Sequence, residues 1–176
     1  MNRLVICYIA VSLDGYIARS DGAVDWLDAY TDLDYGYKDF NDSVDTVIMG
    51  YRTYEKSLEF GPDTFKGKTY YVMSRSQKSE DWGEVRFTRE TPQAICRRLK
   101  TQEGAKIWMM GGGILLSAFL AEGLIDELMM FVIPENLGSG IPLFPEGGPQ
   151  SHWLLSDSVK YPNGVVLLHY HTRVKE

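Results

Sequence analysis

The feature that most constrains the fold of this 176-residue chain is an alternation of short apolar runs with helix-like segments. Six runs rich in β-branched and aromatic residues are predicted strands: residues 4–13, 45–49, 69–73, 85–88, 106–110 and 127–133. Helices are predicted at residues 53–58, 92–100 and 114–122. Strands that alternate with helices form parallel βα units, so we predict an α/β fold with a mostly parallel central sheet and helices on both faces.

The last part of the chain has a different pattern. Two extended runs in "WLLSDSVKYPNGVVLLHYHTRV" are joined by Pro162-Asn163-Gly164, and Asn-Gly is typical of a tight hairpin turn. We therefore expect a C-terminal antiparallel hairpin that completes the sheet. No linker, repeat or low-complexity tract interrupts the chain, so residues 1–176 are expected to form a single domain.

Composition and charge narrow the class of protein. Hydrophobic residues make up 44% of the chain and charged residues 24%, which is typical of a globular domain with its own core. The formal net charge is -6 and no run of Lys or Arg exceeds the pair Arg97-Arg98, so nucleic acid is an unsuitable partner. No stretch approaches the ~20 apolar residues of a membrane span.

The N-terminal apolar run ends at Asp14-Gly15, where a signal peptide would need small residues for cleavage, so a buried strand is expected instead. Cys7 and Cys96 are expected to be packed free thiols, as in a reducing compartment. Together these features predict a cytoplasmic protein.

Three consecutive glycines, Gly111 to Gly113, separate a predicted strand from a predicted helix. Glycine has no Cβ atom, so such a turn lets a ligand approach the main chain, and a helix N-terminus attracts anions. A tight turn with close helix–strand packing would favour the same residues. The pattern is neither G-x-G-x-x-G nor a P-loop, so a nucleoside triphosphate is not indicated.

Two further strand ends carry residues suited to binding phosphate. Gly50, Arg52 and Thr53 follow the second predicted strand, and Ser74, Arg75 and Ser76 follow the third. Each group combines a cation with hydroxyl groups, although an ordinary helix cap with a solvated Arg would look the same. Because ligands of open α/β sheets bind at the carboxyl ends of the strands, we expect the three turns to converge on one dinucleotide.

The motifs "YIAVSLDGYIA", "VIMGYRTYE", "YYVMSRS" and "IWMMGGGILLSAFLAEGLIDEL" occur in an order that resembles the dihydrofolate reductase-like superfamily. From residue 4 to residue 144, and on through the terminal hairpin, the chain is most similar to the reductase domain of the riboflavin-biosynthesis deaminase-reductases, here in a stand-alone form. The resemblance implies a dihydrofolate reductase-like three-layer fold and an NADPH-dependent reductase.

The resemblance also implies roles for individual residues. Ala10 and Ile17 would contact the nicotinamide half, Gly50, Arg52 and Thr53 the phosphates, Ser74 and Arg75 the adenosine 2′-phosphate, and Gly111, Gly112, Gly113 and Ile114 the pyrophosphate and ribose. The roles of Ala10 and Ile17 rest on the resemblance alone.

Two features depart from the riboflavin-pathway pattern. Tyr16 stands where those reductases commonly carry a basic residue that holds the phosphoribosyl substrate, so Tyr16 is a candidate substrate contact. The zinc motifs of the partner deaminase, H-x-E and P-C-x-x-C, are absent from this chain. The substrate therefore stays open between a pterin-like and a ribosylaminopyrimidine-like heterocycle.

An acidic and aromatic segment at residues 25–40 is predicted to be partly helical and to supply the substrate site. Dihydrofolate reductases carry a carboxylate shortly after a Trp, where it binds the pterin and assists its protonation. After Trp26 in this chain, Asp32 has the nearest spacing to that pattern. Trp26 and Tyr35 are candidate substrate contacts, with Tyr35 as a wall for a flat ring. A solvated acidic face and ordinary core packing are the alternatives.

Asp14, at the end of the first predicted strand, is a second candidate acid, although Asp-Gly is also a common turn pair. His169 and His171 share one face of a predicted strand, as two metal ligands would. No third ligand of suitable spacing accompanies them, so no metal site is predicted.

The sequence thus predicts hydride transfer from NADPH to a C=N or C=O bond of a small heterocycle, with Asp32, and next Asp14, on the acid side. A nucleotide-binding module without turnover, such as a redox sensor or interaction protein, is the alternative. The family resemblance also implies a homodimer.

Overall fold

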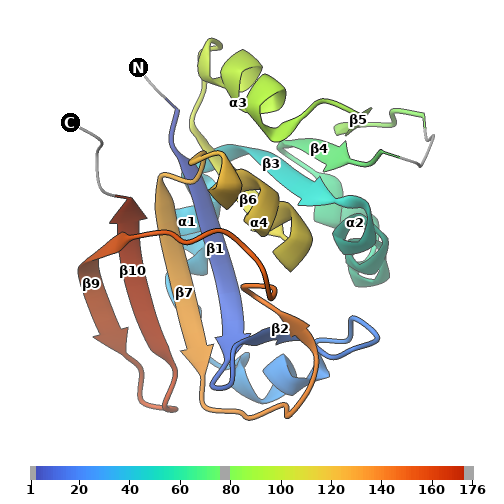
Figure 1. Cartoon of the computed structure of the whole chain (residues 1–176). Coiled ribbons are helices and arrows are strands. Elements are labelled where there is room, and N and C mark those ends of the chain that lie inside the picture. Colours follow the sequence, from blue (N-terminus) through green and yellow to red (C-terminus); the bar gives the residue numbers. More distant parts are fainter. Residues whose placement is uncertain (1–2, 76–79, 173–176) are drawn as a thin grey trace.

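The computed structural model describes residues 3–75 and 80–172, so Ser76 lies outside the described residues. An eight-stranded sheet in the order β5-β4-β3-β6-β1-β7-β10-β9 runs through the molecule (Figure 1). Its strands are β1 (Val5–Ser12), β3 (Val44–Gly50), β4 (Thr69–Met73), β5 (Val85–Thr88), β6 (Lys106–Gly111), β7 (Glu127–Ile133), β9 (Trp153–Lys160) and β10 (Val166–Thr172).

The sheet is mixed but mostly parallel, as predicted. Neighbouring strands from β5 to β7 pair in parallel, whereas β10 is antiparallel to both β7 and β9. Tyr161 and Val165 close the turn between β9 and β10, with a hydrogen bond of 2.9 Å from the Tyr161 N–H to the Val165 carbonyl. Gly164 in that turn has φ +89°, which explains the Asn-Gly signal.

Helices cover both faces of the sheet (Figure 1). The helices α3 (Pro92–Lys100) and α4 (Gly113–Ala121) pack on one face, and α1 (Tyr37–Asp42) and α2 (Tyr51–Ser57) on the other. Three 3-10 helices complete the connections: η1 (Asp25–Tyr30), η2 (Leu58–Phe60) and η3 (Pro62–Phe65). The predicted three-layer fold is confirmed.

Burial of both faces explains why the central strands are continuously apolar. In β1, Val5, Cys7 and Val11 face the core under α3 and α4, whereas the alternate residue Ile6 faces the core under α1 and α2. All four side chains are at most 4% exposed. A strand with two buried faces cannot show the polar alternation of a half-exposed strand.

Helix ends follow the capping residues in the sequence. The Thr91 side chain accepts a hydrogen bond of 3.2 Å from the Ala94 N–H, and Pro92 occupies the first helical position of α3. Gly123, just beyond α4, has φ +62°, the left-handed conformation expected at a helix C-terminus. The predicted boundaries of these two helices are correct within a residue.

Both cysteines are free and buried, as predicted. Burial raises the pKa of Cys7 to about 12 and that of Cys96 to about 11. Neither thiol is therefore a nucleophile at neutral pH, since the thiolate is the reactive form. In the described part of the chain, no helix is long and apolar enough to span a bilayer.

A second, two-stranded sheet was not predicted. It pairs β2 (Tyr16–Ala18) with β8 (Ile141–Pro142), and both strands are too short for a periodic signal in the sequence. Two glycines let this small sheet pack closely. A Cβ atom on Gly140 would lie 2.3 Å from the Ala18 carbonyl oxygen, and one on Gly113 would lie 2.4 Å from the Pro142 carbonyl oxygen.

Asp14 holds the turn between β1 and β2 against the loop that follows β7. Its carboxylate accepts hydrogen bonds from the Ser12 hydroxyl at 2.6 Å, the Leu137 N–H at 3.1 Å and the Gly138 N–H at 2.7 Å. Partial removal of water raises the pKa of Asp14, but these hydrogen bonds outweigh that effect and leave the pKa below its ordinary value.

A lowered pKa in the folded state means that the Asp14 carboxylate stabilises the fold above its unfolded pKa, and that this contribution is lost as the pH falls through the folded pKa. We therefore expect Asp14→Asn to unfold at lower denaturant concentration than the wild type at pH 7, with the difference shrinking toward pH 3. Urea denaturation at both pH values measures this. A difference that is independent of pH would contradict it.

Candidate active site

A cleft of about 1170 Å³ lies across the carboxyl ends of β4, β3, β6 and β1. These four strands are adjacent and parallel, so their ends meet at one edge of the sheet, and three strand gaps span about 14 Å. The cleft is lined there by Ser74 and Arg75 after β4, Gly50 at the end of β3, and Gly112 after β6. A cavity of this size and length accommodates an extended ligand such as a dinucleotide.

The three consecutive glycines serve different purposes. Gly111 has φ +119° and is buried behind the cleft without lining it, and its peptide bond with Gly112 is cis. Gly112 lines the cleft, where an added Cβ atom would meet only the Thr53 hydroxyl at 3.7 Å and the end of Ile17 at 3.9 Å. Gly113 packs against Pro142. Glycine is therefore needed at residue 111 for its positive φ, leaves the main chain open to the cleft at residue 112, and allows close packing at residue 113.

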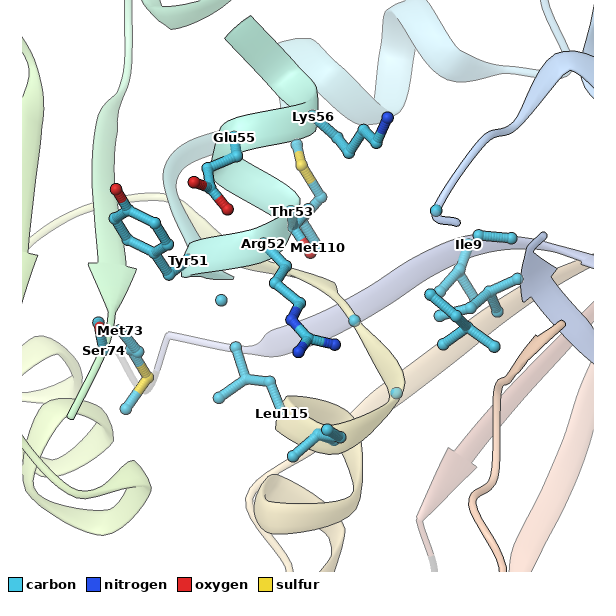
Figure 2. Close-up of a pocket in the computed structure, with 18 of the residues that line it drawn as sticks. Ile9, Tyr51, Arg52, Thr53, Glu55, Lys56, Met73, Ser74, Met110 and Leu115 are labelled. Atoms are coloured by element: carbon cyan, nitrogen blue, oxygen red, sulfur yellow. The ribbon is translucent and has the colours of Figure 1, made fainter. Parts of the chain in front are cut away.

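The predicted residues of α2 lie opposite the glycine turn. Figure 2 shows Arg52 extending from the first turn of α2 toward Leu115 of α4, across the cleft. Arg52 is exposed and has no ion-pair partner among residues 3–75 and 80–172. Thr53 and Ile114 also line the cleft. The guanidinium group is therefore available to a ligand anion.

The end of the cleft beside β4 and β5 is also cationic. Arg75 and Arg89 line it, are exposed, and lack ion-pair partners within the described ranges. Glu90 lines it too, but its carboxylate is bound by the Arg98 guanidinium at 2.5 Å, and that bond holds the pKa of Glu90 below its ordinary value. Glu55 of α2 also lines the cleft and has no ion-pair partner within the described ranges, so unpaired arginines outnumber the unpaired carboxylate here.

A second cavity of about 560 Å³ adjoins the opposite end of the cleft. Tyr8, Ala10 and Leu27 line both cavities, so the two cavities are adjacent at β1. The second cavity is otherwise lined by residues of the segment 30–37, of β7 and of the turn before β10: Tyr30, Thr31, Asp32, Leu33, Asp34, Tyr35, Tyr37, Phe131, Ile133 and Val165. Its walls are therefore mostly aromatic and aliphatic, with two carboxylates.

The hairpin between β9 and β10 positions part of this second cavity. The Asn163 side-chain amide donates hydrogen bonds to the Asp32 carboxylate at 3.3 Å and to the Tyr35 hydroxyl. Asp34 accepts from the Lys38 N–H at 3.2 Å, at the start of α1. Asp32 and Asp34 are exposed, so each faces both the cavity and solvent.

Tyr8 is a site residue that the sequence did not single out, because it lies within an apolar strand. Its ring stacks on Phe40 with centroids 4.2 Å apart and packs on Phe131 at 4.5 Å. Burial raises the pKa of Tyr8 above its ordinary value, so the phenol stays protonated at neutral pH. Its hydroxyl has no hydrogen-bond partner among the residues that the structure describes. Tyr8 lies two residues before Ala10 and so on the same face of β1. This spacing is the sequence signal that could have identified Tyr8 as a site residue.

Three other candidates lie outside both cavities. Asp14 is occupied by its three hydrogen bonds, and Tyr16 pairs with Pro142 in the small sheet. Trp26 is 6% exposed and packs in a core cluster with Phe131. The structure does bring the remaining candidates to the cleft or its side cavity: Ala10, Ile17, Asp32, Tyr35, Gly50, Arg52, Thr53, Ser74, Arg75, Gly112, Gly113 and Ile114.

The histidines lie elsewhere. His169 of β10 pairs with Glu127 of β7, with 3.1 Å between the Nε2 and Oε2 atoms. Within the described residues, no three His, Cys, Asp or Glu side chains gather in a way that would hold a metal ion.

Fold and site together define the class of protein. A mixed eight-stranded sheet with a cleft along its parallel strand ends is the architecture of the dihydrofolate reductase-like reductases. Dihydrofolate reductase from Enterococcus faecalis, solved with NADP(H), superimposes with a TM-score of 0.68 at 18% identity, covering 97% of this chain and 96% of that one. This similarity establishes the shared fold.

The chain belongs to the RibD C-terminal domain family, whose model matches residues 3–167. The protein YwjB of Bacillus subtilis is 43% identical over 97% of this chain and 98% of its own length. A protein from Shewanella sp. PV-4, named as a putative riboflavin biosynthesis protein, superimposes with a TM-score of 0.86 at 29% identity, covering 98% of this chain and 99% of that one.

We expect substitution of the two neighbouring glycines to have different effects on stability and binding. Gly112→Ala places a methyl group in the cleft without a close contact, so we expect unchanged unfolding and weaker binding of NADPH. Gly113→Ala drives a Cβ atom onto the Pro142 carbonyl oxygen, so we expect a loss of about 1–3 kcal/mol in the free energy of unfolding. Urea denaturation and a fluorescence titration of NADPH measure both effects. The same loss of stability in both variants would refute this distinction.

Proposed function

We propose that the protein is an NADPH-dependent reductase that acts on a small heterocycle. The observation that carries this proposal is the convergence of three turns, at residues 50–53, 74–75 and 112–114, on one cleft that lies next to an aromatic and acidic cavity. The family supports a reductase, and the dihydrofolate reductase that shares the fold was solved with NADP(H).

The residues present fit a dinucleotide phosphate. Gly112 leaves a main-chain surface that a Cβ atom would fill, and α4 directs its N-terminus toward it. Arg52 would hold the phosphates in the middle of the cleft, and Arg75 the 2′-phosphate at the β4 end, with Arg89 beside it. Ala10 and Ile17 would then face the nicotinamide end.

When bound, NADPH supplies the hydride from C4 of its nicotinamide ring. The chain's own residues position the acceptor and handle the proton. Tyr8, with its protonated phenol at the junction of the two cavities, would donate a hydrogen bond to the acceptor. Asp32 lines the acceptor's cavity, whereas Asp14 does not, so we assign the acid side to Asp32.

The position of Arg75 leads to a test of cofactor choice. Removing its charge from the β4 end should weaken NADPH binding by about tenfold or more, the value of a charge-assisted hydrogen bond, and leave NADH binding nearly unchanged. Fluorescence titrations of Arg75→Ala with both nucleotides measure this. Arg97→Ala is the matched control, because Arg97 is exposed on α3 and lines neither cavity. An equal loss of affinity for NADPH and NADH would contradict the proposed role of Arg75 in binding the 2′-phosphate.

Turnover is tested by the loss of reduced-nicotinamide absorbance with a panel of pterins and aminopyrimidines. We expect Asp32→Asn to slow the single-turnover hydride step by about 10²-fold and to alter its pH profile, as loss of a general acid does. Asp28→Asn, also exposed but outside both cavities, serves as the control. An unchanged rate and pH profile would exclude Asp32. Binding of NADPH without turnover of any compound would favour the nucleotide-binding module.

A further inference from the structure

The side cavity at residues 30–37 carries no positive charge of its own. Among the described residues that line it, none is Lys, Arg or His, whereas Asp32 and Asp34 are acidic. Lys38 follows directly in α1, but its ammonium group is paired with the Asp42 carboxylate at 2.8 Å. A phosphate group in this cavity would therefore meet carboxylates and no free cation.

The cations that are free to bind phosphate lie toward the other end of the cleft. Arg75 and Arg89 line it beyond β4 and β5, and Arg52 lines it in α2. The β4 end and the β1 end of the cleft are separated by three strand gaps, about 14 Å. Lys56 also lines the cleft, but its ammonium group is paired with the Glu59 carboxylate at 3.1 Å. If the dinucleotide uses the three arginines, no unpaired cation among the described lining residues is left for a phosphate on the acceptor.

The walls of the side cavity are suited to a flat ring. Tyr8, Tyr35, Tyr37 and Phe131 present aromatic surfaces, and Tyr8 is fixed between Phe40 and Phe131. An ionised carboxylate only accepts hydrogen bonds, so Asp34, and Asp32 before it takes up the proton that it passes to the acceptor, favour ring N–H and amino groups. The Tyr8 hydroxyl adds a donor for a ring carbonyl or ring nitrogen.

We propose that this cavity binds a planar, amino-substituted heterocycle that is neutral or cationic and carries no phosphate. This inference rests on the proposed function in one respect: it takes the side cavity as the site of the hydride acceptor. It goes beyond that function by selecting among acceptors, because it disfavours a phosphoribosylated pyrimidine and favours an unphosphorylated ring.

Two matched pairs of compounds test the inference by calorimetry, which requires no turnover. The first pair is 6-hydroxymethylpterin and its phosphate ester, and the second is 5-amino-6-ribosylaminouracil and its 5′-phosphate. Each is titrated into the protein saturated with NADPH. In every pair of which a member binds, we expect the unphosphorylated compound to bind about tenfold tighter or more, because like charges across an interface are strongly unfavourable.

A double variant, Asp32→Asn with Asp34→Asn, tests whether the two carboxylates cause the preference for the unphosphorylated compound. At residue 34, Asn keeps a side-chain oxygen that can accept the hydrogen bond from the Lys38 N–H. The double variant removes both charges, so the difference in affinity within each pair should narrow by about threefold or more. The matched control is Asp39→Asn, Glu103→Gln, which removes two exposed charges outside both cavities and should leave the difference unchanged.

Three outcomes would overturn the inference: a phosphorylated member that binds as tightly as its partner or tighter, a difference that the Asp32, Asp34 variant leaves intact, or no binding by any of the four compounds. Failure of the proposed function is seen separately, since a fluorescence titration of NADPH alone reports on the main cleft. If NADPH does not bind, and titrations without nucleotide still show discrimination among the heterocycles, the reductase is rejected and the cavity's ligand class is kept.

Discussion

The close contact between Gly113 and the Pro142 carbonyl oxygen is the constraint on which the site depends. A Cβ atom at residue 113 would lie 2.4 Å from that oxygen, so only glycine allows α4 to begin where β8 passes. The same small sheet carries Ile17 in β2, which lines the cleft. One packing contact therefore fixes the start of α4, the small sheet and one wall of the cleft together.

Charge is distributed unevenly along the cleft and its side cavity. Arginines without ion-pair partners in the described structure line the middle and the β4 end of the cleft, together with carboxylates such as Glu55. The described lining of the side cavity has carboxylates and aromatic rings and no Lys, Arg or His. A net charge of -6 gives no hint of this separation, because it averages over the surface. The arrangement matches a ligand with phosphates at one end and an uncharged or positively charged ring at the other.

Local sequence signals were sufficient to place much of the lining of the main cleft. Gly50 ends a strand whose apolar pattern is clear, Arg52, Ser74 and Gly112 follow such strands, and parallel strands bring their carboxyl ends to one edge. The lining of the side cavity was harder to predict. Its residues come from the irregular segment 30–37, and Trp26, although suggested by the family, packs in the core instead of lining a cavity.

By itself, the sequence determined the mixed α/β sheet, the capping of α3 and α4, the terminal hairpin and the set of strand-end turns, since all of these arise from local periodicity and turn chemistry. Only the tertiary structure decided that Asp14 is engaged by backbone N–H groups and that Asn163 reaches Asp32 across 131 residues. It alone placed Tyr8 at the junction of two cavities. Such contacts join segments far apart in the chain, and their geometry depends on packing that no local pattern records.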